Sequence, residues 1–200
     1  MTRTLQNLSC EQEEVKSSVL NFAEYKLMEK QKGVFVIEGQ AGTGKSVLVT
    51  SIFNEIQRAH NDKSSVFSGT NNYVLVNHPE MLKFYKRIAG ESSVLLKKNF
   101  DRPTSFINKM LKNTEQADIV IIDEAHLLLT KKDVYNHFFQ ENQLQEIIKH
   151  AKVVIVIFDD NQVLKAKSYW SKQKLIAILG EKNIEIKHLQ KQFRVEADAD

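Results

Sequence analysis

The chain has 200 residues, of which 42% are hydrophobic and 26% charged, and its formal net charge is +3. This length accommodates one α/β domain with a full core and is short for two. The small net charge gives no argument for nucleic-acid binding by itself, and the single cysteine, Cys10, excludes an internal disulfide. No apolar run approaches the length of a membrane span and no signal-peptide core begins the chain, so we expect a cytoplasmic protein without a membrane partner.

The first predicted element is a helix over residues 9–30, in which apolar side chains recur at roughly helical spacing. Ser9 and Gln12, three residues apart, match a capping box that would start this helix.

A phosphate-binding loop follows the next predicted strand. Residues 34–39 read as a buried strand, and an apolar helix is predicted after Ser46. The glycine spacing lets consecutive backbone N–H groups turn toward phosphates at the positive end of that helix. Lys45 is placed to reach the β- and γ-phosphates, and the Ser46 hydroxyl to bind Mg²⁺. The predicted nucleotide-binding residues are Gly39, Gln40, Ala41, Gly42, Thr43, Gly44, Lys45 and Ser46.

The middle of the chain is less regular. Short apolar runs at residues 65–68 and 73–76 are candidates for one or two parallel strands, and Pro79 is suited to the first turn of a helix reaching Ile88. A strand at 94–96 and a helix at 105–112 are further expectations.

The second half alternates strands and helices. Four consecutive β-branched residues, 119–122, predict a central strand buried on both faces. A helix over 142–149, a strand over 152–158, a helix ending near Gly180 and a strand over 184–189 complete the pattern. We therefore expect an α/β fold, a parallel sheet with helices on both faces, whose ligands bind beyond the carboxyl ends of the strands.

Two carboxylates stand at the end of the central strand. Asp123 is placed to hold Mg²⁺, and Glu124 to act as the general base that polarises the attacking water. Acidic residues also favour helix starts, so this pair alone would be ambiguous. Together with Lys45 and Ser46, the catalytic interpretation is the stronger one.

Polar residues after the last two strands allow two interpretations. Asp159 and Gln162 follow the strand predicted over 152–158, where a side-chain amide could touch the γ-phosphate or simply face solvent. Arg194 follows the last strand, where it could be a surface residue or could stabilise charge that develops during phosphoryl transfer.

These motifs, in this order, resemble superfamily 1 helicases, and most closely the Schlafen-like bacterial DNA/RNA helicase domains. The resemblance covers nearly the whole chain, and Phe158 stands where the third family motif has glycine. The matching segments are Leu8 to Gln12, Gly39 to Ser46, Asp123-Glu-Ala-His126, Asp159-Asp-Asn-Gln162 and Leu189-Gln-Lys-Gln-Phe-Arg194.

The resemblance implies a RecA-like ATPase domain that uses ATP and Mg²⁺. It implies that Gln12 contacts adenine, that Gln162 senses the γ-phosphate and that Arg194 binds phosphate. The segment from Val76 to Pro79 lies where the family contacts single-stranded nucleic acid. Such helicases have a second RecA-like domain, which we expect this chain to lack because it ends six residues after Arg194.

The leading functional prediction is the ATP-hydrolysing half of a DNA or RNA motor, with weak activity in this chain alone. An AAA-type or switch-like ATPase without nucleic acid is the main alternative; an interaction module and a small-molecule kinase are weaker ones. Basic residues between 83 and 112 are more typical of a solvated surface than of a groove. Aromatic residues that could stack on bases lie among them: Phe84, Tyr85, Phe100 and Phe106.

Overall fold

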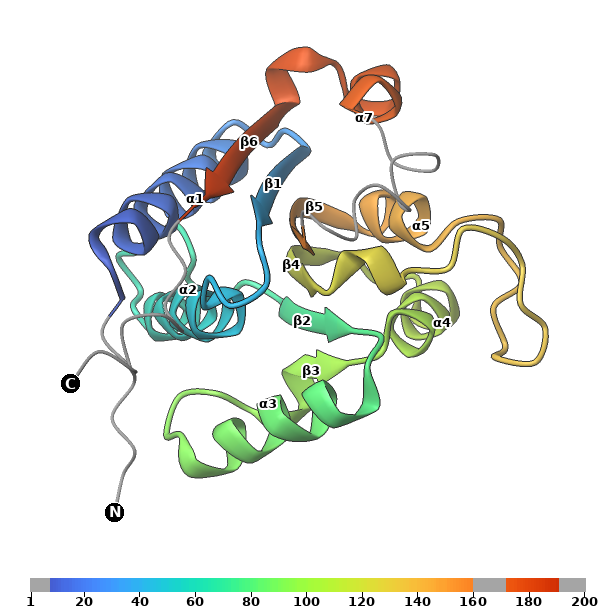
Figure 1. Ribbon diagram of the computed structural model, residues 1–200, viewed down its shortest axis with the longest axis horizontal. Helices are drawn as coiled ribbons and strands as arrows, with labels where there is room; N and C mark the ends of the chain where they lie inside the picture. Colours follow the sequence, from blue (N-terminus) through green and yellow to red (C-terminus); the bar gives the residue numbers. More distant parts are fainter. Residues whose placement is uncertain (1–7, 160–171, 191–200) are drawn as a thin grey trace.

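The computed structural model describes residues 8–159 and 172–190. Its centre is a six-stranded sheet in the order β3-β2-β4-β5-β1-β6, and every pair of neighbouring strands is parallel. Figure 1 shows this sheet with the phosphate-loop strand β1 between β5 and β6. The strands are β1 (Gly33–Gly39), β2 (Asn72–Val76), β3 (Phe100–Asp101), β4 (Ala117–Asp123), β5 (Ala151–Asp159) and β6 (Ile184–Leu189).

Helices cover both faces of the sheet, as the alternating pattern predicted (Figure 1). Helices α1 (Cys10–Met28), α2 (Lys45–His60) and α3 (Pro79–Glu91) pack on one face. The other face carries α4 (Pro103–Asn113), α5 (Gln143–Lys149) and α7 (Lys172–Leu179). Short 3-10 turns are η1 (Lys97–Asn99), η2 (Ala125–Leu127) and η3 (Glu181–Asn183).

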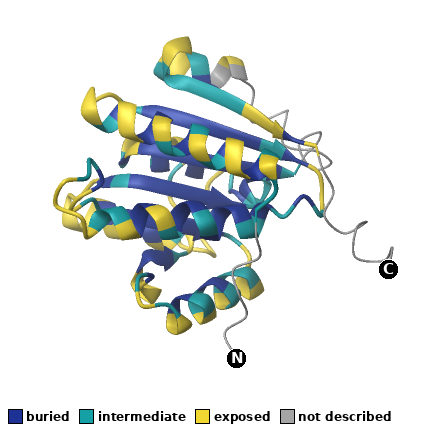
Figure 2. Ribbon diagram, turned by 90° about the vertical axis from the view of Figure 1, so that its left-hand side faces the viewer, coloured by how far each residue is buried: buried dark blue, intermediate teal, exposed yellow. Residues whose placement is uncertain are grey.

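The core is divided by the sheet into two apolar layers. Alternate side chains of β4 enter opposite layers: Ile119 and Ile121 join the α1–α3 side, while Val120 and Ile122 join the other. Because both faces are covered, β4 and β5 are buried along most of their length, and Figure 2 shows the central strands largely in dark blue beneath helices whose outer faces are exposed.

Several local signals act as the sequence predicts. Both hydrogen bonds of the Ser9–Gln12 capping box are present at the start of α1. Pro79 occupies the first turn of α3. A further cap, which was not predicted from the sequence, is the Asn142 side chain, which accepts from the backbone N–H of Gln145 at the start of α5.

Of the candidate strands, 73–76 forms as β2, while 65–68 and 94–96 do not form strands. Residues 65–68 form consecutive turns, because the Ser65 hydroxyl accepts from the Phe67 N–H and the Ser65 carbonyl accepts from Ser68. Residues 94–96 are also irregular, since the Ser92 hydroxyl accepts from the N–H groups of Val94 and Leu95. The edge strand is instead the two-residue β3, which pairs with β2.

The carboxyl ends of the central strands meet at one edge of the sheet. Gly39 at the end of β1 is in register with Asp159 at the end of β5. Asp123 ends β4, which neighbours β5 on the side away from β1. Residues far apart in the sequence are thereby brought beside the phosphate loop. Within the described ranges, no helix is both long and apolar enough to cross a membrane.

Candidate functional site

The loop between β1 and α2 has the backbone geometry of an anion cradle. Gly42 and Gly44 have φ values of 88° and 72°, a left-handed conformation that glycine adopts without steric strain. Gly44 is the N-cap of α2 and supplies no side-chain hydrogen bond to the helix. The first N–H groups of α2 are therefore directed at the loop, where the positive end of the helix favours a phosphate.

The ammonium group of Lys45 lies inside this loop. Its Nζ donates to the carbonyl oxygens of Gly39 at 2.8 Å and Gln40 at 2.7 Å, and lies 3.3 Å from Oδ2 of Asp159. Only 9% of the residue is exposed. The ends of β1 and β5 thus hold one buried cation at the sheet edge.

Asp123 is a buried carboxylate with both oxygens hydrogen-bonded. Oδ2 accepts from the Tyr85 hydroxyl at 2.6 Å and Oδ1 from the backbone N–H of Glu124 at 2.9 Å, and the residue is 1% exposed. Burial raises the pKa of Asp123, while these two hydrogen bonds, the Lys45 charge and a Ser46 hydrogen bond oppose the rise. The same surroundings hold the carboxylate in one orientation.

Glu124 adopts a left-handed backbone conformation, with φ at 51°, directly after the strand. Burial, followed by the negative charge of Asp123, raises the pKa of the Glu124 carboxyl. His126 Nε2 lies 3.3 Å from Glu124 Oε2, and the buried His126 Nδ1 has no hydrogen-bond partner within the described ranges. A carboxylate with a raised pKa in this position suits a general base.

The residues near Asp123 fit a magnesium ion. The Ser46 hydroxyl is close enough to Asp123 to lower the pKa of its carboxyl, so a hydroxyl and a carboxylate oxygen lie together. Magnesium binds proteins through one or two such oxygen ligands, with phosphate and water completing its shell. Residues 8–159 and 172–190 contain no cluster of three or more His, Cys, Asp or Glu that could hold a metal alone. This donor set therefore matches a metal bound together with a nucleotide.

Gln12 connects α1 to the phosphate loop. Its Nε2 donates to the carbonyl oxygens of Thr43 at 2.9 Å and Gly44 at 3.4 Å, and its Oε1 accepts from the Ser9 N–H at 3.0 Å. The residue is 2% exposed. The amide thus supports the loop backbone, and its contact with adenine stays a prediction.

The structure brings together most, but not all, of the predicted site residues. Gln12, the loop 39–46, Asp123 and Glu124 lie at one edge of the sheet. Gln162 and Arg194 lie outside the described residues. Tyr85 was missed as a site residue, because its place in an amphipathic helix gave no signal of a hydroxyl contact 38 positions away.

The aromatic residues predicted among the basic side chains are mostly core. Tyr85, Phe100 and Phe106 are 0%, 3% and 0% exposed, so they cannot stack on bases. Phe84 is half-buried and lies under the Arg87 guanidinium at 5.8 Å. Exposed aromatic rings of the described chain lie elsewhere, at Tyr25, Tyr135 and Phe139.

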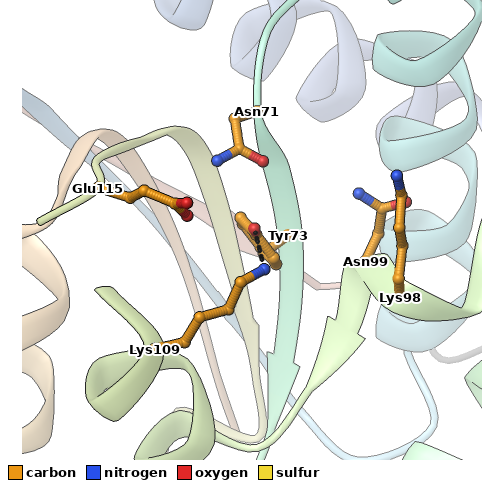
Figure 3. Close-up of a pocket in the computed structure, with 6 residues that line it drawn as sticks. All are labelled: Asn71, Tyr73, Lys98, Asn99, Lys109 and Glu115. Carbon is orange, nitrogen blue, oxygen red and sulfur yellow. Dashed lines mark hydrogen bonds between the residues drawn. The ribbon is translucent and has the colours of Figure 1, made fainter. Parts of the chain in front are cut away.

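Two cavities of about 300 Å³ lie away from the phosphate loop. Figure 3 shows the first, where Lys109 Nζ donates to the Tyr73 hydroxyl at 2.9 Å. Asn71 and Glu115 also line it and precede β2 and β4, which places it at the amino ends of the strands. The second begins at Asn77, beyond the carboxyl end of β2.

A model of one protein family matches most of the chain. The family is described as Schlafen group 3, DNA/RNA helicase domain, and the match covers residues 32–200. It includes the phosphate loop, Asp123 and Glu124, while Gln12 lies before the matched range.

The chain also resembles individual proteins. It is 46% identical over 171 residues to the Saccharomyces cerevisiae protein YPL245W, and this alignment covers 82% of the chain and 38% of the yeast protein. Among solved structures, the Candida albicans Pif1 helicase has 20% identity and a TM-score of 0.46, covering 96% of this chain and 42% of that one. The Pyrococcus furiosus Hef helicase domain has 13% identity and a TM-score of 0.45, and the match covers 84% of this chain and 38% of the Hef chain. The chain thus spans less than half the length of these relatives.

Proposed function

We propose that this chain, which belongs to the Schlafen group 3 DNA/RNA helicase domain family, binds Mg·ATP at the phosphate loop and hydrolyses it. The observation that carries the proposal is the meeting of Lys45, Asp123 and Glu124 at one sheet edge, where their charges affect one another. A phosphate loop, a metal carboxylate and a base are the parts that phosphoryl transfer to water requires.

Each residue has a distinct role in this proposal. The loop N–H groups and the Lys45 ammonium bind the β- and γ-phosphates, and Ser46 with Asp123 holds the metal. Magnesium, when bound, neutralises charge on the phosphates. Glu124 accepts the proton of the attacking water through its carboxylate, and the raised pKa strengthens it as a base.

The finer assignments follow from the family resemblance. We assign Gln12 to adenine contact, Gln162 to sensing the γ-phosphate and Arg194 to binding phosphate. We also propose that this chain forms one RecA-like domain and that a second RecA-like domain of the parent protein closes the nucleotide cleft. Movement along DNA or RNA would then require both domains.

The test is ATP hydrolysis by the parent-length protein with and without single-stranded DNA or RNA. Lys45→Ala should abolish nucleotide binding, and Glu124→Gln should retain binding but lose hydrolysis by a factor of about 100 or more. Matched controls are Lys152→Ala and Glu115→Gln, which change charges outside the loop and should hydrolyse ATP normally.

Three outcomes separate the possibilities. Stimulation of hydrolysis by either polymer supports the motor function. Hydrolysis that neither polymer changes would leave a switch-like ATPase and reject the motor. Calorimetric Mg·ATP binding that survives Lys45→Ala unchanged would reject the site itself.

A further inference from the structure

The segment between η2 and α5 displays a cluster of exposed apolar side chains. Tyr135 is 92% exposed, Val134 59% and Phe139 55%, which puts three of the eight exposed large hydrophobic residues of the described chain within six positions. In Figure 1 this segment is the yellow-to-orange loop that projects beyond α4. Tyrosine and phenylalanine are normally at least partly covered in monomers, so exposed rings grouped in this way indicate a binding surface.

The exposed rings stand on an ordered hairpin, defined here as residues 131–139. Asp133 and Phe138 exchange two backbone hydrogen bonds of 2.9 Å, and the Asn136 side chain donates to Asp133 at 2.7 Å. Phe138 is fully buried in the core layer under α4 and α5. The Asn108 side chain of α4 donates to the His137 carbonyl at 3.2 Å. The hairpin is therefore fixed to the domain, which limits the entropy lost when its rings bind a partner.

A cavity of about 300 Å³ lies between the turn of this hairpin, α4 and the loop after β2. Asn136 and His137 line it from the hairpin, Arg102 and Asn108 from the start and body of α4, and Asn77 from the end of β2. The Asn77 side chain also donates to the Leu127 carbonyl at 2.9 Å, in the turn that follows Glu124. The cavity thus lies on the same sheet edge as the nucleotide site.

The chemistry of this surface suits unpaired bases. Amide side chains and hydroxyls donate and accept hydrogen bonds, as base edges require, and exposed rings provide stacking platforms. Lys131, Lys132 and Arg102 supply positive charge, and the Lys132 ammonium lies 5.9 Å from the Phe139 ring. Hydrogen bonds from Asn136 lower the pKa of Asp133, so this carboxylate is ionised and offsets part of that charge.

We propose that the 131–139 hairpin and the adjoining cavity bind single-stranded nucleic acid, with Tyr135 and Phe139 stacking on bases and Arg102 contacting the backbone. The proposal rests on the proposed motor function and identifies the surface that would contact the DNA or RNA. Surfaces that bind proteins have a more apolar and less charged centre than this surface, which is bordered by three asparagines, an arginine and two lysines. Because the hairpin has little net charge, stacking should supply more of the affinity than phosphate contacts.

The experiment measures binding of fluorescein-labelled 20-nucleotide dT and rU oligomers to the chain by anisotropy, at several salt concentrations. Tyr135→Ala should weaken binding by about 5- to 150-fold, the range for loss of one stacked base, and Tyr135→Phe should restore it. Arg102→Gln should lower the slope of log affinity against log salt by about one. Tyr25→Ala, which removes a 56% exposed tyrosine from α1, is the matched control and should bind normally.

Several results would overturn the proposal. The first is that Tyr135→Ala and Phe139→Ala bind the oligomers as tightly as the wild-type chain. The second is that the wild-type chain binds no oligomer even at low salt. The third is that Tyr135→Ala abolishes self-association of the chain while oligomer binding persists. Calorimetry of Mg·ATP with the same variants keeps the two proposals apart. If the variants bind both Mg·ATP and the oligomers as the wild-type chain does, only this surface is rejected. If the wild-type chain itself does not bind Mg·ATP, the ATP site is rejected.

Discussion

The Tyr85 hydroxyl donates a 2.6 Å hydrogen bond to Oδ2 of Asp123, joining the middle of α3 to the end of β4. Tyr85 is fully buried and stacks on Phe100 with ring centroids 5.7 Å apart and an interplanar angle of 14°. Burial, followed by the charge of Asp123, raises the pKa of Tyr85 well above its usual value, so the hydroxyl remains a donor. Packing of α3 therefore fixes the carboxylate assigned to magnesium.

Tyr85→Phe should weaken the metal site with little change of shape. It removes one hydrogen bond from a buried carboxylate, and loss of such supporting contacts reduces metal affinity by about 10- to 100-fold. A magnesium titration of nucleotide binding should show this increase in the half-saturating concentration, while metal-free nucleotide binding stays nearly constant.

Tyr73→Phe is the control for that experiment. Its hydroxyl accepts from Lys109 at the amino end of β2, away from Asp123. Equal magnesium dependence of Tyr85→Phe and wild type would contradict the positioning role of the Tyr85 hydroxyl.

Gln12→Ala tests whether this residue acts on the loop, on adenine or on both. The variant loses the donor to the Thr43 carbonyl and half of the capping box, so the free energy of unfolding should fall by about 1–2 kcal/mol. If the amide shapes the loop, affinity for ATP and for inorganic triphosphate should fall together in calorimetry. A loss confined to ATP would instead assign Gln12 to adenine alone.

Phe138 and Phe139 are neighbours in the hairpin with opposite environments. Phe138 is fully buried and Phe139 is 55% exposed. Phe138→Ala should lower the free energy of unfolding by about 3–5 kcal/mol through cavity formation, whereas Phe139→Ala should change it by about 0.5 kcal/mol or less. Chemical denaturation followed by circular dichroism measures both; similar values for the two variants would contradict the hairpin geometry.

His150, at the end of α5, should make stability depend on pH. Burial lowers its pKa from the ordinary value of 6.5, and the nearby Glu146 carboxylate opposes the shift. Between the folded-state pKa and 6.5 the unfolded chain binds more protons, so the free energy of unfolding rises with pH in that window. Denaturation midpoints from about pH 5 to 7.5 should show a slope that His150→Gln reduces. An unchanged slope would assign the pH dependence to other groups.

Local patterns in the sequence predict most of the sheet and the nucleotide loop. The strand at 184–189 occurs as predicted. The capping box starts α1 at Cys10, one residue after the predicted start of the helix at residue 9. The failures are short apolar runs, at 65–68 and 94–96, where serine hydroxyls bind backbone N–H groups in place of a neighbouring strand. Such competition is decided by a few hydrogen bonds, which apolar periodicity does not register.

The sequence by itself determined the fold class and the residues of the phosphate loop, because both depend on local spacing and strand–helix alternation. Only the tertiary structure decided which distant groups complete the site. Tyr85 reaches Asp123, Gln12 reaches Thr43, and Asp159 reaches Lys45 across 38, 31 and 114 positions. It also decided that Tyr25, Tyr135 and Phe139 are exposed, while Tyr85 and Phe100 are core. Strand order and helix packing set these contacts, and neither is encoded in the spacing of any one segment.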